Sequence, residues 1–293
     1  MIAVTGATGH LGHLTLQALI QRGVPAGDLV ALVRDPARAA DLAAQGITVR
    51  QANHHQPERL RAALQGVDRL LLVSSSDLND RVGQHRNVVE AAREAGVTLL
   101  AYTSFLAADT TPVRLAADHR ATEALIRASG VPFAFLRNGW YWENYDGSIQ
   151  QGLGHGGLIG AAGEGRFTPA ARADFAAAAA TVLSGKGHEG QVYELGGDQA
   201  ITLADLAAEV ERQSGRPFRY TNLPALEYAQ ALVGFGVPDE MASVLADSDT
   251  GIERGLLATD SGDLSRLIGH PTTTLAQAMR AALAGLGTPS QSA

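Results

Sequence analysis

Short apolar runs alternate with amphipathic stretches along the first 138 residues of the chain. The apolar runs predict β-strands over residues 2–5, 29–34, 47–51, 68–75, 98–103 and 132–137. The stretches between them carry apolar residues at helical spacing and predict helices over residues 11–22, 36–45, 57–65, 81–95 and 115–129. Strands that are apolar throughout and separated by helices are typical of a doubly wound parallel α/β sheet covered on both faces.

The ends of these helices carry the residues that commonly start and stop helices. A glycine follows each helix, as expected where a chain leaves a helix through a left-handed conformation. These glycines are Gly23, Gly46, Gly66, Gly96 and Gly130. Asp35 and Pro36 predict the cap and the first residue of the second helix.

A glycine-rich turn follows the first strand and opens the first helix. Its residues are Gly6, Ala7, Thr8, Gly9, His10, Leu11 and Gly12. Such a turn lets the backbone approach a pyrophosphate, and the helix behind it directs free N–H groups and its positive dipole end at the anion. The turn therefore predicts a dinucleotide site made by these seven residues. A structural turn that binds no ligand is the alternative, because glycine turns also cap helices.

Arg34 closes the second strand, at the position that meets the adenosine ribose in dinucleotide-binding sheets. An acidic residue there favours NAD, whereas a guanidinium suits the 2′-phosphate of NADP. We therefore expect NADP, with NADPH as its reduced form. A solvent-exposed surface arginine is the alternative.

After residue 138 the alternation changes. Residues 139–165 hold two tryptophans, two tyrosines and nine glycines, a composition too irregular for another strand–helix crossover unit. A helix over 174–184 with Asp174 as N-cap and a strand over 191–195 return the chain to the sheet. Helical spacing resumes over 202–214, and short helices and turns follow to about residue 286. Residues 288–293 have the composition of a frayed tail.

This change divides the chain into two expected parts. We predict a Rossmann-type NADP-binding domain from residues 1–138 and 166–196. A smaller substrate-binding lobe is predicted from residues 139–165 and 197–293.

Composition excludes several classes of function. The net charge of −7 argues against nucleic acid as a partner, and the absence of cysteine excludes disulfides and thiol chemistry. The chain enters its first strand at once and has no apolar stretch of membrane-spanning length, so we expect a cytoplasmic protein without a membrane partner. Histidine and carboxylate spacing predicts no metal site.

Ligands of parallel sheets bind beyond the carboxyl ends of the strands, so the residues that follow each strand are candidates. Expected cofactor contacts are Ser74, Ser75, Ser76, Thr103, Ser104 and Asn138. Expected substrate contacts are Phe105, Asn138, Trp140, Tyr141 and Asn144. Four aromatic residues within 138–145 suit a planar ring, and the two asparagines suit a carboxamide or a quinone oxygen. For Trp142 and Tyr145, packing in the core is the alternative to a contact with the substrate.

Several sequence blocks resemble the NmrA-like atypical short-chain dehydrogenases, and among them the type 2 NAD(P)H:quinone oxidoreductases. The blocks are the glycine turn, Val33–Pro36, Ser74–Ser76, Tyr102–Ser104, Arg137–Tyr141, Arg172–Asp174, Gly190–Leu195, Leu245–Asp249 and Leu267–Leu275. The resemblance implies an α/β fold, NADPH as hydride donor, a quinone as the small-molecule substrate and a possible homodimer. Triphenylmethane and azo dye reductases, and NmrA-type regulators that bind the dinucleotide without turnover, are similar as well.

The chain departs from similar sequences after the third strand. It has Ala52-Asn53-His54 where they tend to have Ala-Asp-Tyr, which puts an aspartate contact near the adenine in doubt.

The proton chemistry of short-chain dehydrogenases is absent from the sequence. No Tyr-x-x-x-Lys motif exists, and Lys186 is the only lysine. Quinone reduction is less demanding, because the ring becomes aromatic and water can supply the proton. His119, with Glu123 one helical turn away, is a weak acid–base candidate, and a solvent-exposed pair on a helix face is its alternative. Asp247 and Asp249 beside Gly251 predict a turn.

Overall fold

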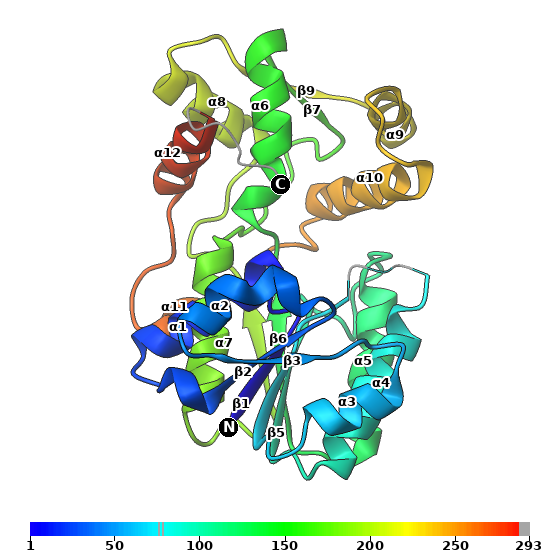
Figure 1. The fold of residues 1–293 in the computed structure, drawn as a ribbon. Helices are drawn as coiled ribbons and strands as arrows, with labels where there is room; N and C mark the ends of the chain where they lie inside the picture. The colour runs from blue at the N-terminus through cyan, green and yellow to red at the C-terminus, as the bar shows by residue number, and fades with distance from the viewer. Residues whose placement is uncertain (76, 78, 287–293) are drawn as a thin grey trace.

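A seven-stranded parallel sheet forms the centre of the computed structural model, which describes residues 1–75, 77 and 79–286 (Figure 1). The strand order is β3-β2-β1-β4-β5-β6-β8. The strands are β1 (Ile2–Thr5), β2 (Leu29–Val33), β3 (Thr48–Gln51), β4 (Arg69–Leu72), β5 (Leu99–Phe105), β6 (Phe133–Asn138) and β8 (Gln191–Leu195). This confirms the predicted doubly wound sheet, whose strand order changes direction between β1 and β4.

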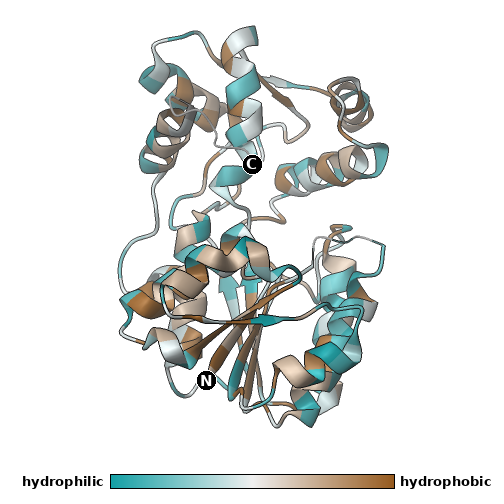
Figure 2. Ribbon diagram, in the orientation of Figure 1, coloured by the Kyte–Doolittle hydropathy of each residue, from teal (hydrophilic) through white to brown (hydrophobic). Residues whose placement is uncertain are grey.

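Helices cover both faces of the sheet. One face carries α1 (His10–Gln21), α2 (Ala40–Ala44), α7 (Arg172–Ser184) and α11 (Asp263–Ile268). The other carries α3 (Pro57–Ala63), α4 (Arg81–Glu94) and α5 (Ala116–Ser129). Short 3₁₀ turns lie before β2 and α2, as η1 (Ala26–Asp28) and η2 (Pro36–Ala39). All five residues of β2 are buried, and Figure 2 shows the strands as the apolar centre of this layered arrangement.

The remaining elements lie beyond the carboxyl edge of the sheet (Figure 1). They are η3 (Trp142–Tyr145), α6 (Asp146–His155), β7 (Gly157–Gly160), α8 (Leu203–Ser214), β9 (Arg219–Asn222), α9 (Ala225–Gly234), α10 (Asp239–Glu253) and α12 (Leu275–Leu286). β7 and β9 form a separate two-stranded parallel sheet. Helix α11 packs instead on α7 and β8, although it lies within the segment assigned by sequence to the substrate lobe. Among the described helices, none is both long and apolar enough to cross a bilayer.

Several local predictions are confirmed. The five glycines after the helices all have φ between 72° and 87°. Asp35 caps η2 by accepting from the backbone N–H of Ala37. The helical spacing predicted over 202–214 corresponds to α8, which starts with a reciprocal capping box between Thr202 and Asp205.

Other local predictions are wrong. Residues 139–165 add no crossover unit to the central sheet, as expected, because they form η3, α6 and β7, and β7 pairs with β9; the wrong predictions concern single residues. Asp247 and Asp249 lie inside the fifteen-residue helix α10 and not in a turn. Helix α7 begins at Arg172, and Asp174 does not cap it, because the carboxylate accepts from the backbone N–H of Thr273. The predicted tail, residues 288–293, lies outside the described residues.

Candidate functional site

A cavity of about 370 Å³ lies at the carboxyl edge of the sheet, where the strand order changes direction. The predicted residues that line it are Gly6, Thr8, Gly9, His10, Leu11, Gly12, Arg34, Ser74 and Ser75. Lining residues that sequence reasoning missed include Arg38, His54, His55, Asp77 and Gln84. The structure therefore brings together residues from the ends of β1, β2, β3 and β4.

The glycine turn owes its shape to the absence of side chains. Gly6 has φ +59°, in the left-handed region, and its carbonyl accepts from the N–H of Gly9 at 2.8 Å. A Cβ on Gly12 would lie 2.5 Å from the Gly6 carbonyl oxygen, so only glycine lets α1 start this close to the turn. Ala7 is fully buried in the core cluster and does not line the cavity, in contrast to its predicted role.

The N-terminus of α1 is open to an anion. Its N-cap is Gly9, which provides no side-chain cap, and its first turn carries no acidic residue. The first N–H groups of a helix have no acceptor within the helix, and the helix dipole adds positive potential there. This end of the cavity therefore fits a pyrophosphate.

Two guanidinium groups lie at the other end of the cavity. Arg34 follows β2 directly and is exposed, and Arg38 comes from η2. Neither forms an ion pair with another described residue. The carboxylate of neighbouring Asp35 is occupied by the Ala37 N–H at 3.0 Å. Both arginines are thus available to a doubly charged phosphate.

The residues after β3 form the wall next to Arg34. Burial lowers the pKa of His54 to about 4, and the charge of Arg34 acts in the same direction, so this imidazole is neutral near pH 7. The Asn53 side chain accepts from the His55 N–H at 3.0 Å. The Asn53 side chain therefore shapes the turn. Similar sequences tend to have an aspartate at this position, and this chain has none to contact the adenine.

The serine and threonine residues after β4 and within β5 have different surroundings. Ser74 and Ser75 line the cavity, and Ser76 lies outside the described residues. Thr103 and Ser104 are inside β5, which is longer than predicted, and both are buried. Thr103 Oγ1 accepts from the Ser74 N–H at 2.9 Å, so Thr103 supports the lining without being part of it.

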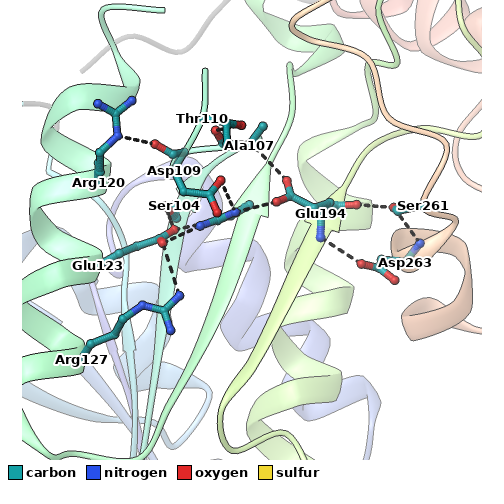
Figure 3. A network of polar contacts seen from close by, with 12 residues as sticks. Ser104, Ala107, Asp109, Thr110, Arg120, Glu123, Arg127, Glu194, Ser261 and Asp263 are labelled. Carbon is teal, nitrogen blue, oxygen red and sulfur yellow. Dashed lines mark hydrogen bonds and ion pairs between the residues drawn. The ribbon is translucent and has the colours of Figure 1, made fainter. Parts of the chain in front are cut away.

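Ser104 belongs to a buried ionic network centred on Arg137 (Figure 3). Arg137 donates to both oxygens of Glu123, at 2.9 and 2.7 Å, and to Glu194 at 2.8 Å. Burial alone would lower the pKa of Arg137, but these two carboxylates raise it overall. Glu194 also accepts from the N–H of Ala107, whose φ is +49°. The network thus fixes the loop after β5, and an arginine inside an apolar strand was its signal in the sequence.

His119 does not pair with Glu123 as the weak acid–base assignment required. Its Nδ1 lies 2.8 Å from the Tyr102 hydroxyl, and Glu123 is occupied by Arg137. Burial lowers the pKa of His119 to about 3. A neutral imidazole bonded to a buried phenol cannot supply a proton as an imidazolium near pH 7.

The segment after β6 places Asn138 and Tyr141 together. Asn138 Nδ2 donates to the Tyr141 hydroxyl at 3.1 Å, and the Asn138 Oδ1 is buried without a partner among the described residues. The Tyr141 ring packs edge-on against Phe175, and Arg172 lies 5.4 Å from the ring centre. Asn144 is exposed and accepts from Arg172 at 3.3 Å. These contacts leave the Tyr141 O–H free to donate.

The other aromatic residues of this region belong to the core beyond the sheet. Phe105, Trp140, Trp142 and Tyr145 are buried in one apolar cluster. Trp142 Nε1 donates to the Thr273 carbonyl at 3.2 Å, which confirms the core alternative for this residue. Trp140 Nε1 and the Tyr145 hydroxyl are buried without a partner among the described residues. Trp140 therefore differs from Trp142 in having an unused donor.

The chain matches the family model described as NAD(P)H-binding over residues 6–186, which include the glycine turn, Arg34 and Arg137. The chain belongs to this NAD(P)H-binding family. It is 55% identical to quinone oxidoreductase 2 of Escherichia coli strain K12 over 279 residues, which cover 95% of this chain and 97% of that protein. The expected resemblance to NmrA-like proteins and type 2 quinone oxidoreductases is confirmed.

Solved structures of similar proteins have the same architecture. The NADPH-dependent quinone oxidoreductase of Escherichia coli, complexed with NADPH, has a TM-score of 0.94 and 54% identity, and the match covers 97% of this chain and 100% of that chain. The triphenylmethane reductase of Citrobacter sp., complexed with NADP(H), has a TM-score of 0.92 and 38% identity, with 96% and 100% covered.

Proposed function

We propose that the protein is an NADPH-dependent quinone oxidoreductase that transfers a hydride directly from NADPH to a quinone. The observation that carries the proposal is the cavity at the change of strand order, which joins an open helix N-terminus to two unpaired arginines. The 55% identity to a quinone oxidoreductase over nearly the whole chain supports the choice of acceptor.

The residues around the cavity fit NADPH in their chemistry. The turn from Gly6 to Gly12 and the first N–H groups of α1 would hold the pyrophosphate. Arg34 and Arg38 would hold the 2′-phosphate, which NADH lacks. Ser74 and Ser75 would lie along the pyrophosphate and the nicotinamide ribose.

NADPH supplies the hydride when bound, and the quinone becomes a hydroquinone by taking this hydride and one proton. The protein's own contribution is to orient the acceptor and to exclude water. Burial raises the pKa of Tyr141, so its hydroxyl stays protonated, and the Asn138 amide occupies the phenol oxygen. We propose the Tyr141 O–H as the donor to an acceptor oxygen, with the buried Trp140 N–H as a second candidate; neither residue lines the coenzyme cavity. Positioning of this kind accounts for catalysis without a dedicated acid, with the proton taken from water.

Ketone reduction through a tyrosine–lysine pair does not fit this geometry. Tyr102 is fully buried, and burial raises the pKa of its phenol. Lys186 is exposed in the turn that leads from α7 into β8, at the amino edge of the sheet. Lys186 and the cavity therefore lie at opposite edges of the sheet, so this lysine does not reach a tyrosine at the site.

Stopped-flow mixing of the purified protein with NADPH and a benzoquinone tests the proposal. We expect NADPH absorbance to fall over many turnovers and hydroquinone to form in equal amount. Binding of NADPH without oxidation by any of several quinones would instead support a regulator that senses the reduced coenzyme.

A dye reductase is the second candidate, because the Citrobacter sp. structure is a triphenylmethane reductase. The same assay with a triphenylmethane dye as acceptor distinguishes the two. A larger kcat/KM for the dye than for every quinone tried would reject the quinone as the preferred acceptor.

Three finer statements are also proposals. We propose a substrate lobe beyond the sheet, a homodimer in solution and a cytoplasmic location. Limited proteolysis, analytical ultracentrifugation and cell fractionation test them in turn.

A further inference from the structure

Helix α4 holds Ser75 by both backbone groups and by its hydroxyl. The Ser75 N–H donates to His85 Nε2 at 3.0 Å, and the Ser75 carbonyl accepts from Arg81 Nε at 2.8 Å. The Ser75 hydroxyl donates to Gln84 Oε1 at 2.9 Å. Arg81, Gln84 and His85 are all buried, although helix residues of these types usually face solvent. Because Ser75 lines the coenzyme cavity, α4 shapes the edge of that cavity.

The contact between Ser75 and His85 fixes the protonation of the imidazole. A backbone N–H can only donate, so His85 Nε2 must accept and the ring proton must sit on Nδ1. Nδ1 lies 2.9 Å from Thr122 Oγ1 on α5 and therefore donates to it. His85 is fully buried, and burial lowers its pKa to about 3, so it remains in this neutral form near pH 7.

The ring of His85 packs against a second buried polar pair. The Tyr102 ring lies edge-on to the His85 ring, with 5.4 Å between the two ring centres. The Tyr102 hydroxyl lies 2.8 Å from His119 Nδ1, and both residues are buried. Two buried histidines and a buried tyrosine therefore lie behind the cavity.

We propose that His85 is a positioning residue for the coenzyme, which holds the Ser75 backbone at the edge of the dinucleotide cavity through a fixed Nδ1–H tautomer. The inference rests on the proposed coenzyme role of the cavity. Ser75 follows β4, whereas Arg34 follows β2 on the far side of β1. His85 therefore acts on the part of the dinucleotide that NADPH and NADH share, and not on the 2′-phosphate.

Three variants separate positioning from packing. His85→Phe keeps a ring beside Tyr102, whose centre is 5.4 Å away, but removes both hydrogen bonds. His85→Gln keeps an acceptor for Ser75 and a donor for Thr122. Val88→Ala is the matched control, because Val88 is fully buried on the same helix and belongs to its apolar cluster.

The dissociation constants of NADPH and NADH, measured by calorimetry, are the main readout. We expect His85→Phe to weaken both coenzymes by about the same factor, roughly tenfold, because the Ser75 N–H loses its acceptor. His85→Gln should restore binding to within about twofold, and Val88→Ala should lower the Tm without weakening binding. With both substrates saturating, kcat should change by less than about twofold while KM for NADPH rises.

Unchanged coenzyme binding in His85→Phe overturns the inference, and so does a loss confined to NADPH or an equal loss in Val88→Ala. Should His85→Phe fail to fold, the tautomer can be read in the unaltered protein by ¹⁵N NMR, with His85→Gln used for assignment. A proton on Nε2 or a charged ring also overturns it. Failure of the unaltered protein to bind either coenzyme would instead reject the proposed function.

Discussion

At the coenzyme end of the site, the fit comes from backbone and from residues that are close in sequence. The glycine turn, the open N-terminus of α1 and Arg34 all lie within the first 34 residues. At the acceptor end, Asn138, Trp140 and Tyr141 depend on side chains from α7 and from the core beyond the sheet. The coenzyme end requires positions without side chains, so that the backbone can approach the ligand. The acceptor end requires hydrogen-bond donors that no other contact in the protein uses. Substitutions should therefore act by steric exclusion at one end and by loss of orientation at the other.

The largest effect is expected from Gly12→Ala at the coenzyme end. The new Cβ would lie 2.5 Å from the Gly6 carbonyl oxygen, so α1 must shift away from the turn. We expect NADPH binding to weaken by roughly a hundredfold or more, measured by fluorescence titration. Gly147→Ala on α6, where nothing lies within 4 Å of the added Cβ, is the control. Equal binding by both variants would show that the turn does not contact the coenzyme.

Arg34→Ala should change coenzyme preference. Loss of a charge-assisted hydrogen bond to the 2′-phosphate predicts roughly 30-fold weaker NADPH binding, with NADH binding nearly unchanged. Arg212→Ala, which removes an exposed arginine on α8, is the matched control. Competitive titration with both coenzymes gives the ratio, and a parallel loss for NADH would argue against phosphate recognition.

The acceptor end can be tested with a pair of matched tryptophan variants. Trp140→Phe removes an unused N–H, whereas Trp142→Phe removes one that is bonded to Thr273. We expect Trp140→Phe to lower kcat/KM for the quinone about tenfold at unchanged NADPH affinity. Trp142→Phe should mainly lower the Tm. Steady-state kinetics with a varied quinone concentration decides, and equal kinetics for the two variants would count against Trp140.

The smallest effect on activity is expected in the core beyond the sheet, where the change is in stability. Burial raises the pKa of Asp249 to about 6, above its unfolded value near 3.8, so its ionisation opposes folding as pH rises from about 4 to 6. Asp249→Asn should gain about 3 kcal/mol of unfolding free energy at pH 8 and nothing at pH 4. Urea unfolding at both pH values measures it, with exposed Glu240→Gln on α10 as control. An equal gain in unfolding free energy at both pH values would contradict a raised pKa for Asp249.

The sequence predicted the coenzyme end better than the acceptor end. The strands, the capping residue Asp35 and the glycine turn were readable because each depends on neighbours in the chain. Thr103 and Ser104 were placed after β5, but they are buried within it. Their partners lie on other elements, and the sequence pattern of one strand does not contain that information.

The amino-acid sequence by itself determined the alternation of strands and helices, the family resemblance and the coenzyme class, since local periodicity and backbone freedom are written in consecutive residues. Only the tertiary structure decided that Glu123 pairs with Arg137 and not with His119, and that His85 carries its proton on Nδ1. The Glu123 pairing and the His85 tautomer both depend on which polar groups folding brings together as water is removed. Buried groups must then satisfy one another, and that choice is made across distant segments of the chain.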